Sequence, residues 1–265
     1  MRDWADMNEL RRQEVIAELK ALVRAYELGN RPTGTLPSLP FGLSEIDSIL
    51  PTGGLMLGAI HEVLGGGPDS VHGAASASFL GGIPAQTQGP VIWTFVRRDL
   101  FAPALAGVGL HPDRVIYVEA GDNKTVLLVL EEALRHAGLG GVVGEIEGPV
   151  GLTASRRLQL AAEASGVMGL IMRRPRRLAV NVEAEPTAAY TRWRVTAVPS
   201  GPPLPWSPDT PGVARARWKL DLLRCRGGEP KSFVVGACDA TGRLGLPADV
   251  ADRSDAPVEQ DRAIA

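Results

Sequence analysis

Residues 58–73 read Gly-Ala-Ile-His-Glu-Val-Leu-Gly-Gly-Gly-Pro-Asp-Ser-Val-His-Gly, a strand that enters a glycine-rich turn before a run of small residues. We predict the strand over 59–64 and a helix over 73–80. Nucleotide-binding proteins hold phosphate at such a corner, because backbone amides at the start of the helix point toward the anion. The stretch therefore predicts an α/β fold with a corner that resembles a phosphate loop.

The corner lacks the side chains of a working phosphate loop. Such a loop reads Gly-x-x-x-x-Gly-Lys-Ser/Thr, in which the Lys neutralises charge and the hydroxyl holds magnesium. No Lys occurs between His61 and Gln88, and Asp69 adds negative charge. The residues that remain are Gly65, Gly66, Gly67, Ser70 and Gly73. The sequence favours a structural turn over a weak nucleotide site, and it argues against ATP and magnesium as cofactors.

The composition is that of a soluble globular protein of 265 residues, with 45% hydrophobic and 22% charged residues. Two cysteines, Cys225 and Cys238, form neither a disulfide scaffold nor a four-ligand zinc site, so we expect core thiols and a reducing, cytoplasmic setting. The first residues are acidic and lack an apolar core, and no apolar run approaches the roughly 20 residues that span a bilayer. We expect no signal peptide and no membrane contact.

Charge is distributed unevenly along the chain. Residues 1–150 hold 11 Lys and Arg against 18 Asp and Glu, whereas residues 151–231 hold 14 against 6. A basic segment beside an acidic one suggests a polyanion site or a head-to-tail interface, which includes self-association. Scattered, solvated arginines are the alternative interpretation.

Three regions follow from the patterning. Residues 1–32 form the first, an amphipathic helix with Val15, Leu19 and Leu22 on one face, which the Gly and Pro residues at 29–32 end. The prolines of 31–40 indicate a linker. Residues 33–250 form the core, and the polar tail 251–265 is expected to be disordered.

Strands alternate with helices in the first part of the core. Strands are predicted at 89–96, 115–118, 141–146 and 167–172, and helices at 100–107, 124–137 and 154–164. This alternation predicts a mostly parallel sheet with helices on both faces. After residue 178 the pattern changes to strands at 191–198, 218–226 and 232–237, the last two joined by a turn at 227–230. We therefore expect a C-terminal antiparallel hairpin.

This order of elements resembles the RecA recombinase core, with residues 53–62 as the approach to the phosphate loop. The resemblance places the family's catalytic acid at Arg97 or Arg98 and its sensing Gln at Arg173 or Arg174. Its magnesium-side strand ends here in Glu145, which we interpret as a strand-end acid and not as a metal ligand. Phosphoryl transfer needs several positioned cations and a residue that orients water, so these departures predict a protein that is not an enzyme.

Within that superfamily the chain is similar to the ImuA family, on residues 61–68, 98–117, 152–166, 191–194 and 224–230. The resemblance implies a role in translesion synthesis induced by DNA damage, as part of the SOS response. It also implies two partners: ImuB, a Y-family polymerase-like protein, and an error-prone replicative-type DNA polymerase subunit. We expect a non-catalytic adaptor. A DNA-stimulated ATPase and a regulator of RecA filaments remain alternatives.

The densest basic cluster, residues 173–177, falls where RecA-like proteins begin a DNA-contacting loop. Arginines there would neutralise phosphates of single-stranded DNA. Our candidates for DNA binding are Arg156, Arg157, Arg173, Arg174, Arg176, Arg177, Arg192 and Arg194. A solvated loop or contact with an acidic protein surface is the competing interpretation. Trp193 and Trp218 are expected in the core of the sheet and not as platforms for bases.

Overall fold

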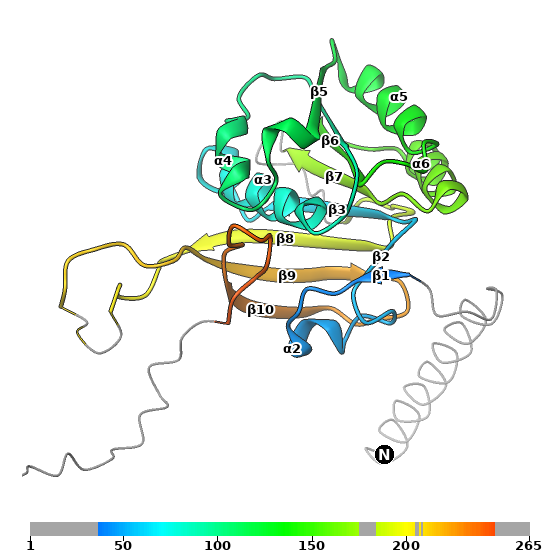
Figure 1. The fold of residues 1–265 in the computed structure, drawn as a ribbon. Coiled ribbons are helices and arrows are strands. Elements are labelled where there is room, and N and C mark those ends of the chain that lie inside the picture. The colour runs from blue at the N-terminus through cyan, green and yellow to red at the C-terminus, as the bar shows by residue number, and fades with distance from the viewer. Residues whose placement is uncertain (1–36, 175–183, 205–206, 208, 247–265) are drawn as a thin grey trace, which may run out of the picture.

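The computed structural model describes residues 37–174, 184–204, 207 and 209–246 (Figure 1). The predicted N-terminal helix, the candidates Arg176 and Arg177, and the tail 251–265 lie outside these residues. Within them, none of the helices is both long enough and apolar enough to cross a membrane.

An eight-stranded sheet with the order β10-β9-β8-β3-β7-β6-β4-β5 organises the described chain. Its strands are β3 (Ile60–Gly65), β4 (Val91–Phe95), β5 (Val115–Glu119), β6 (Gly141–Glu147), β7 (Gly169–Arg174), β8 (Thr191–Val198), β9 (Arg217–Cys225) and β10 (Lys231–Gly236). Neighbours are parallel except for β9, which is antiparallel to both β8 and β10. The predicted mostly parallel sheet and C-terminal hairpin are confirmed. A small separate sheet pairs β1 (Ser38–Leu39) with β2 (Leu55–Met56).

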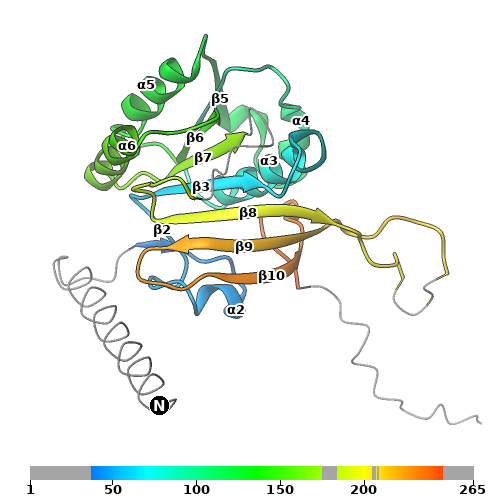
Figure 2. The ribbon, with the colours of Figure 1, turned by 180° about the vertical axis from the view of Figure 1, so that it is seen from behind.

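Helices cover both faces of the parallel part of the sheet (Figures 1 and 2). One face carries α3 (Asp69–Ala85) and α4 (Ala102–Ala106), and the other carries α5 (Asn123–Ala133) and α6 (Leu152–Ser165). The short helices α2 (Ser44–Asp47) and η1 (Pro112–Arg114) complete the described set. This layering confirms the predicted α/β class.

Successive strand residues enter opposite layers of the core. Val143 and Leu170 pack with the α3 side, whereas their neighbours Val142 and Ile171 pack with the α5 and α6 side. Such two-sided burial explains why these strands read as continuous apolar runs. Trp193 and Trp218 are buried on the α3 side, as predicted.

Helix α3 is longer than predicted at both ends. It begins at Asp69, directly after Pro68, where an acidic residue favours the positive end of the helix. It then continues through Gly81 and Gly82, which have low helix propensity. A Cβ on Gly82 would lie 2.4 Å from the Sγ atom of Cys238, so close packing explains why small residues occupy this turn.

Candidate functional site

The glycine-rich corner is shorter than a phosphate loop. Strand β3 ends at Gly65 and α3 begins at Asp69, which leaves three connecting residues. The N–H of Gly66 donates to the carbonyl of Val195 over 2.9 Å, and a Cβ on Gly66 would lie 1.9 Å from the Oγ1 atom of Thr196. The corner therefore packs directly on β8, and at least one of its backbone amides already donates a hydrogen bond within the protein. These contacts favour the structural turn.

Two of the predicted loop residues belong to the helix instead. Ser70 and Gly73 lie in the first turns of α3, and a Cβ on Gly73 would approach the Oδ1 atom of Asp69 to 2.8 Å. The predicted boundary at residue 73 placed the helix start one turn too late. Pro68 is the N-cap, and its carbonyl accepts from the N–H groups of Val71 and His72 at 3.0 and 3.1 Å, which sets the helix start at Asp69.

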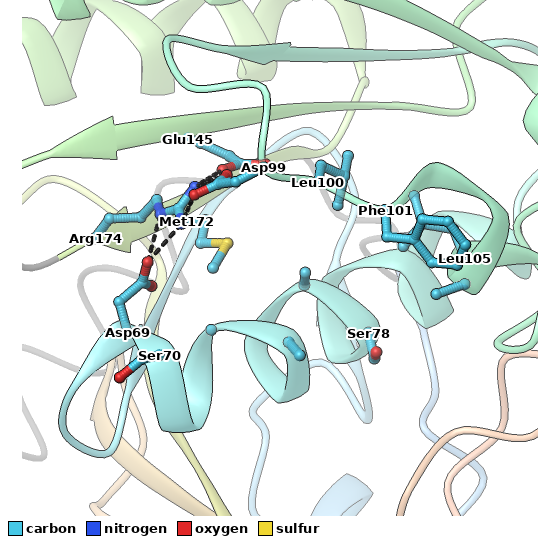
Figure 3. Close-up of a pocket in the computed structure, with 14 residues that line it drawn as sticks. Asp69, Ser70, Ser78, Asp99, Leu100, Phe101, Leu105, Glu145, Met172 and Arg174 are labelled. Atoms are coloured by element: carbon cyan, nitrogen blue, oxygen red, sulfur yellow. Dashed lines mark hydrogen bonds and ion pairs between the residues drawn. The ribbon is translucent and has the colours of Figure 1, made fainter.

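A cavity of about 300 Å³ lies beside the first turns of α3 (Figure 3). Its residues come from α3, from the segment after β4, from α4, and from β6 and β7. They are Asp69, Ser70, Gly73, Ala74, Ala77, Ser78, Asp99, Leu100, Phe101, Ala104, Leu105, Glu145, Met172 and Arg174. Charged side chains gather at one end of the cavity, and Leu100, Phe101 and Leu105 lie toward the other.

Arg174 fills the charged end and binds three carboxylates. Its Nη1 and Nη2 atoms lie 2.6 and 2.7 Å from the two oxygens of Asp99. Nη2 is also 2.5 Å from Asp69, and Nη1 is 2.7 Å from Glu145. The Arg174 side chain is only 8% exposed. We call Asp69, Asp99, Glu145 and Arg174 the arginine–carboxylate cluster.

Burial and hydrogen bonding act in opposition within this cluster. Burial raises the pKa of Glu145, although the indole N–H of Trp93, at 2.8 Å, and Arg174 both stabilise its ionised form. Hydrogen bonds from Arg174 lower the pKa of Asp99. Burial disfavours the charge on Arg174, but hydrogen bonds to Asp99 and Asp69 outweigh it, and the pKa of Arg174 is raised. Arg174 therefore stays charged within this cluster.

A second arginine extends the cluster toward solvent. Arg97 is 3.3 Å from Asp69 and 2.5 Å from Glu147, and its side chain is 47% exposed. Four carboxylates thus meet two guanidinium groups, which gives a formal excess of negative charge. Phosphate sites need positive potential and free donors. The charges at this corner disfavour a nucleotide.

A separate buried cluster lies on the opposite face of the sheet, around Glu62. The carboxylate of Glu62 receives Nε of Arg192 at 2.7 Å and the hydroxyl of Thr187 at 2.8 Å, and Nη1 of Arg173 lies 3.6 Å away. Arg173 also binds Glu185 at 2.6 Å and donates to the carbonyl of Gly148 at 2.8 Å. Neighbouring strand residues point to opposite faces, so Arg173 and Arg174 anchor the end of β7 from both sides.

The candidate DNA-binding arginines do not form one exposed surface. The side chains of Arg173, Arg174 and Arg192 are 1%, 8% and 2% exposed and lie among carboxylates, which corrects their interpretation as groups facing a phosphate backbone. The physical reason is that each lies in a covered strand, where a charge needs a partner. The remaining described candidates lie nearer the surface. Arg156 is exposed, Arg157 is bound to Glu131, and Arg194 lies 3.0 Å from Asp221. DNA contact by these three stays a prediction.

The sequence did not lead us to predict that two acids, Glu62 and Glu145, pair with the buried arginines. Glu62 lies inside the buried strand segment Ile60 to Leu64, and Glu145 lies between Val143 and Ile146. A carboxylate in a strand that is buried on both faces requires a cation nearby. That signal predicts a partner, but it does not say which arginine supplies it.

Comparison with known proteins bears on the family. No family model matches the chain. The chain is 42% identical over 224 residues to the Protein ImuA of two strains of Caulobacter vibrioides, and each match covers 81% of this chain and 88% of the relative.

Proposed function

The chain belongs to the ImuA family, and on this premise we propose that it acts as a non-catalytic, RecA-like adaptor in bacterial translesion DNA synthesis after DNA damage. The observation that carries the proposal is the arginine–carboxylate cluster. It places the guanidinium of Arg174 and three carboxylates beside the start of α3, where a nucleotide-binding relative would hold phosphate.

The charges of the cluster disfavour phosphoryl transfer. That reaction needs cations directed at the transferred phosphoryl group and a group that orients the attacking nucleophile. Here the cation nearest the corner, Arg174, is committed to Asp69, Asp99 and Glu145. The surrounding carboxylates would repel the phosphates, and no Lys is present between residues 61 and 88 to offset them.

We expect the purified full chain neither to bind nor to hydrolyse Mg-ATP. Binding of labelled ATP should show no saturation at millimolar nucleotide, and phosphate release should match a protein-free blank with or without single-stranded DNA. A RecA recombinase serves as the positive control in the same assay. Hydrolysis that single-stranded DNA stimulates would show that the chain is an ATPase and would overturn the non-catalytic proposal.

The proposed partners are an ImuB-like Y-family polymerase-like protein and an error-prone replicative-type DNA polymerase subunit. Membership of the ImuA family supports this choice. The arginine–carboxylate cluster at the corner supports a function in contacts with other macromolecules. Single-stranded DNA is a further proposed ligand, through Arg156, Arg157 and Arg194.

Affinity capture with the tagged full chain tests the partnership. From cells exposed to a DNA-damaging agent, we expect to recover the ImuB-like protein together with the polymerase subunit. An untagged strain that receives the same treatment controls for adsorption to the resin. Recovery of RecA without either polymerase-like protein would contradict the adaptor proposal and support a regulator of RecA filaments.

A further inference from the structure

We infer that the cavity beside α3 is a docking site for a protein partner, and that it accepts a segment in which an arginine or lysine adjoins an aromatic or aliphatic residue. This inference rests on the proposed adaptor function and names the surface through which one contact is made. The cavity, its charge and its apolar end each restrict the occupant.

The cavity has the size and position of a binding pocket. Its volume of about 300 Å³ lies at the lower end of the range for ligand pockets. Helix α3 forms one wall through Ala74 and Ala77, and the segment from Asp99 to Ala104 forms another (Figure 3). The first wall belongs to a long helix that packs on the sheet, and the second belongs to the segment that leads into α4, which Leu105 anchors in the core.

The charged end selects a cation. Asp69, Asp99 and Glu145 share Arg174, and Arg97 is shared with Glu147, so the carboxylates outnumber the guanidinium groups by two. Asp99 is the accessible member, because its side chain is 45% exposed. A cleft that carries one sign of charge concentrates ligands of the opposite sign. A nucleic acid or an acidic peptide is disfavoured here for the same reason.

The apolar end selects a hydrophobic group next to that cation. Leu100 and Leu105 line this end of the cavity, and Phe101 lines it with 70% of its surface exposed. An exposed aromatic side chain beside a pocket is typical of interfaces, where aromatic and arginine side chains supply much of the binding energy. A flexible small cation satisfies the carboxylates but leaves Phe101 in water, so a peptide segment fits both ends better.

The test uses the full chain labelled with ¹⁵N and three probes: acetyl-Phe-Arg-amide, acetyl-Phe-norleucine-amide and spermidine. The indole N–H of Trp93 reports on the site, because it donates to Glu145, and the chain has only five tryptophans whose indole signals must be separated. We expect the Phe-Arg probe to shift this signal saturably. Its Kd should be at least fivefold lower than that of the neutral norleucine probe and of spermidine.

Three variants locate the binding. Asp99→Asn should weaken the Phe-Arg probe at least fivefold, and Ala74→Leu, which fills the cavity from an exposed helical position, should abolish saturable binding. Glu119→Gln is the matched control, since Glu119 is 44% exposed and pairs with Arg98 outside the cavity. It should bind as the unmodified chain does.

The inference is overturned if the Phe-Arg probe gives no saturable shift, or if the norleucine probe or spermidine binds equally well. Binding that Asp99→Asn leaves unchanged would also overturn it. If the probes do not bind and Mg-ATP is not hydrolysed, the docking site is contradicted but the adaptor proposal is not. Hydrolysis of Mg-ATP removes the adaptor proposal whatever the probes do.

Discussion

Glu62→Gln is expected to lower the free energy of unfolding by about 3–5 kcal/mol, the range for breaking a buried ion pair by removing one partner. Glu62 is fully buried and neutralises Arg192 while lying near Arg173. The substitution keeps the volume of the side chain and an acceptor for the Thr187 hydroxyl, so the change in charge dominates. Among the described contacts, Arg173 would keep the carboxylate of Glu185, and Arg192 would keep the backbone carbonyl of the same residue.

Urea unfolding at pH 7, followed by tryptophan fluorescence, measures this loss. Glu131→Gln is the matched control, because Glu131 also pairs with two arginines, Arg135 and Arg157, but both are 57% exposed. Exposed pairs contribute little, and we expect a loss under about 1 kcal/mol for this control. Equal losses for the two variants would contradict the assignment of Glu62 as the buried counter-ion.

The arrangement of strands and helices was predictable because local patterns carry it. The alternation of Trp218, Leu220 and Leu222 with charged residues marks β9, and the left-handed Gly166 ends α6 where the sequence indicates. The resemblance of the element order to the RecA core was drawn from the same local patterns. These features depend on residues that are close in sequence. They can be recognised even when each predicted boundary of a helix or strand is wrong by a few residues.

The site was not predictable in the same way, since its contacts are made across the sheet. Arg174 meets Asp69 across 105 residues and Asp99 across 75. A cluster of arginines in the sequence gives the same pattern whether it faces DNA or internal acids. The distinction depends on the strand order, which brings β6 beside β7 and the start of α3 close to both. The sequence shows that the Lys of a phosphate loop is absent, but it does not show that Arg174 lies at the corner in its place.

Arg174→Met is expected to lower the free energy of unfolding by about 3 kcal/mol at pH 7, because it leaves the buried carboxylate of Glu145, together with Asp69 and Asp99, without their main counter-ion. Among the described residues, Asp69 and Asp99 would keep the half-exposed Arg97, at 3.3 and 3.8 Å, and Glu145 would keep the indole N–H of Trp93. The Met side chain preserves the apolar stem of Arg174 in the covered strand, so the loss is chiefly electrostatic.

The sign of the pH dependence follows from the two shifted carboxyl groups. The pKa of Asp99 is lowered in the folded protein, so its pair with Arg174 stabilises the fold above the unfolded pKa of about 3.9, and this stabilisation is lost as the pH falls through the folded pKa. The pKa of Glu145 is raised by burial, and Arg174 opposes that rise. Without Arg174 both pKa values move up. A carboxyl with a raised folded pKa destabilises the fold above that pKa, and the penalty fades as the group gains its proton.

The deficit of Arg174→Met relative to the unmodified chain should therefore be largest at pH 7 and shrink toward pH 5. Urea unfolding at pH 7, 6 and 5 measures it, and the Trp93 indole signal reports protonation of Glu145 directly. Arg97→Met, which removes the exposed arginine of the same corner, should cost under about 1 kcal/mol. A deficit that stays constant from pH 7 to pH 5 would contradict ionised Glu145 as the source of the loss. The variant should still fail to bind Mg-ATP, because the carboxylates that repel phosphate remain in place.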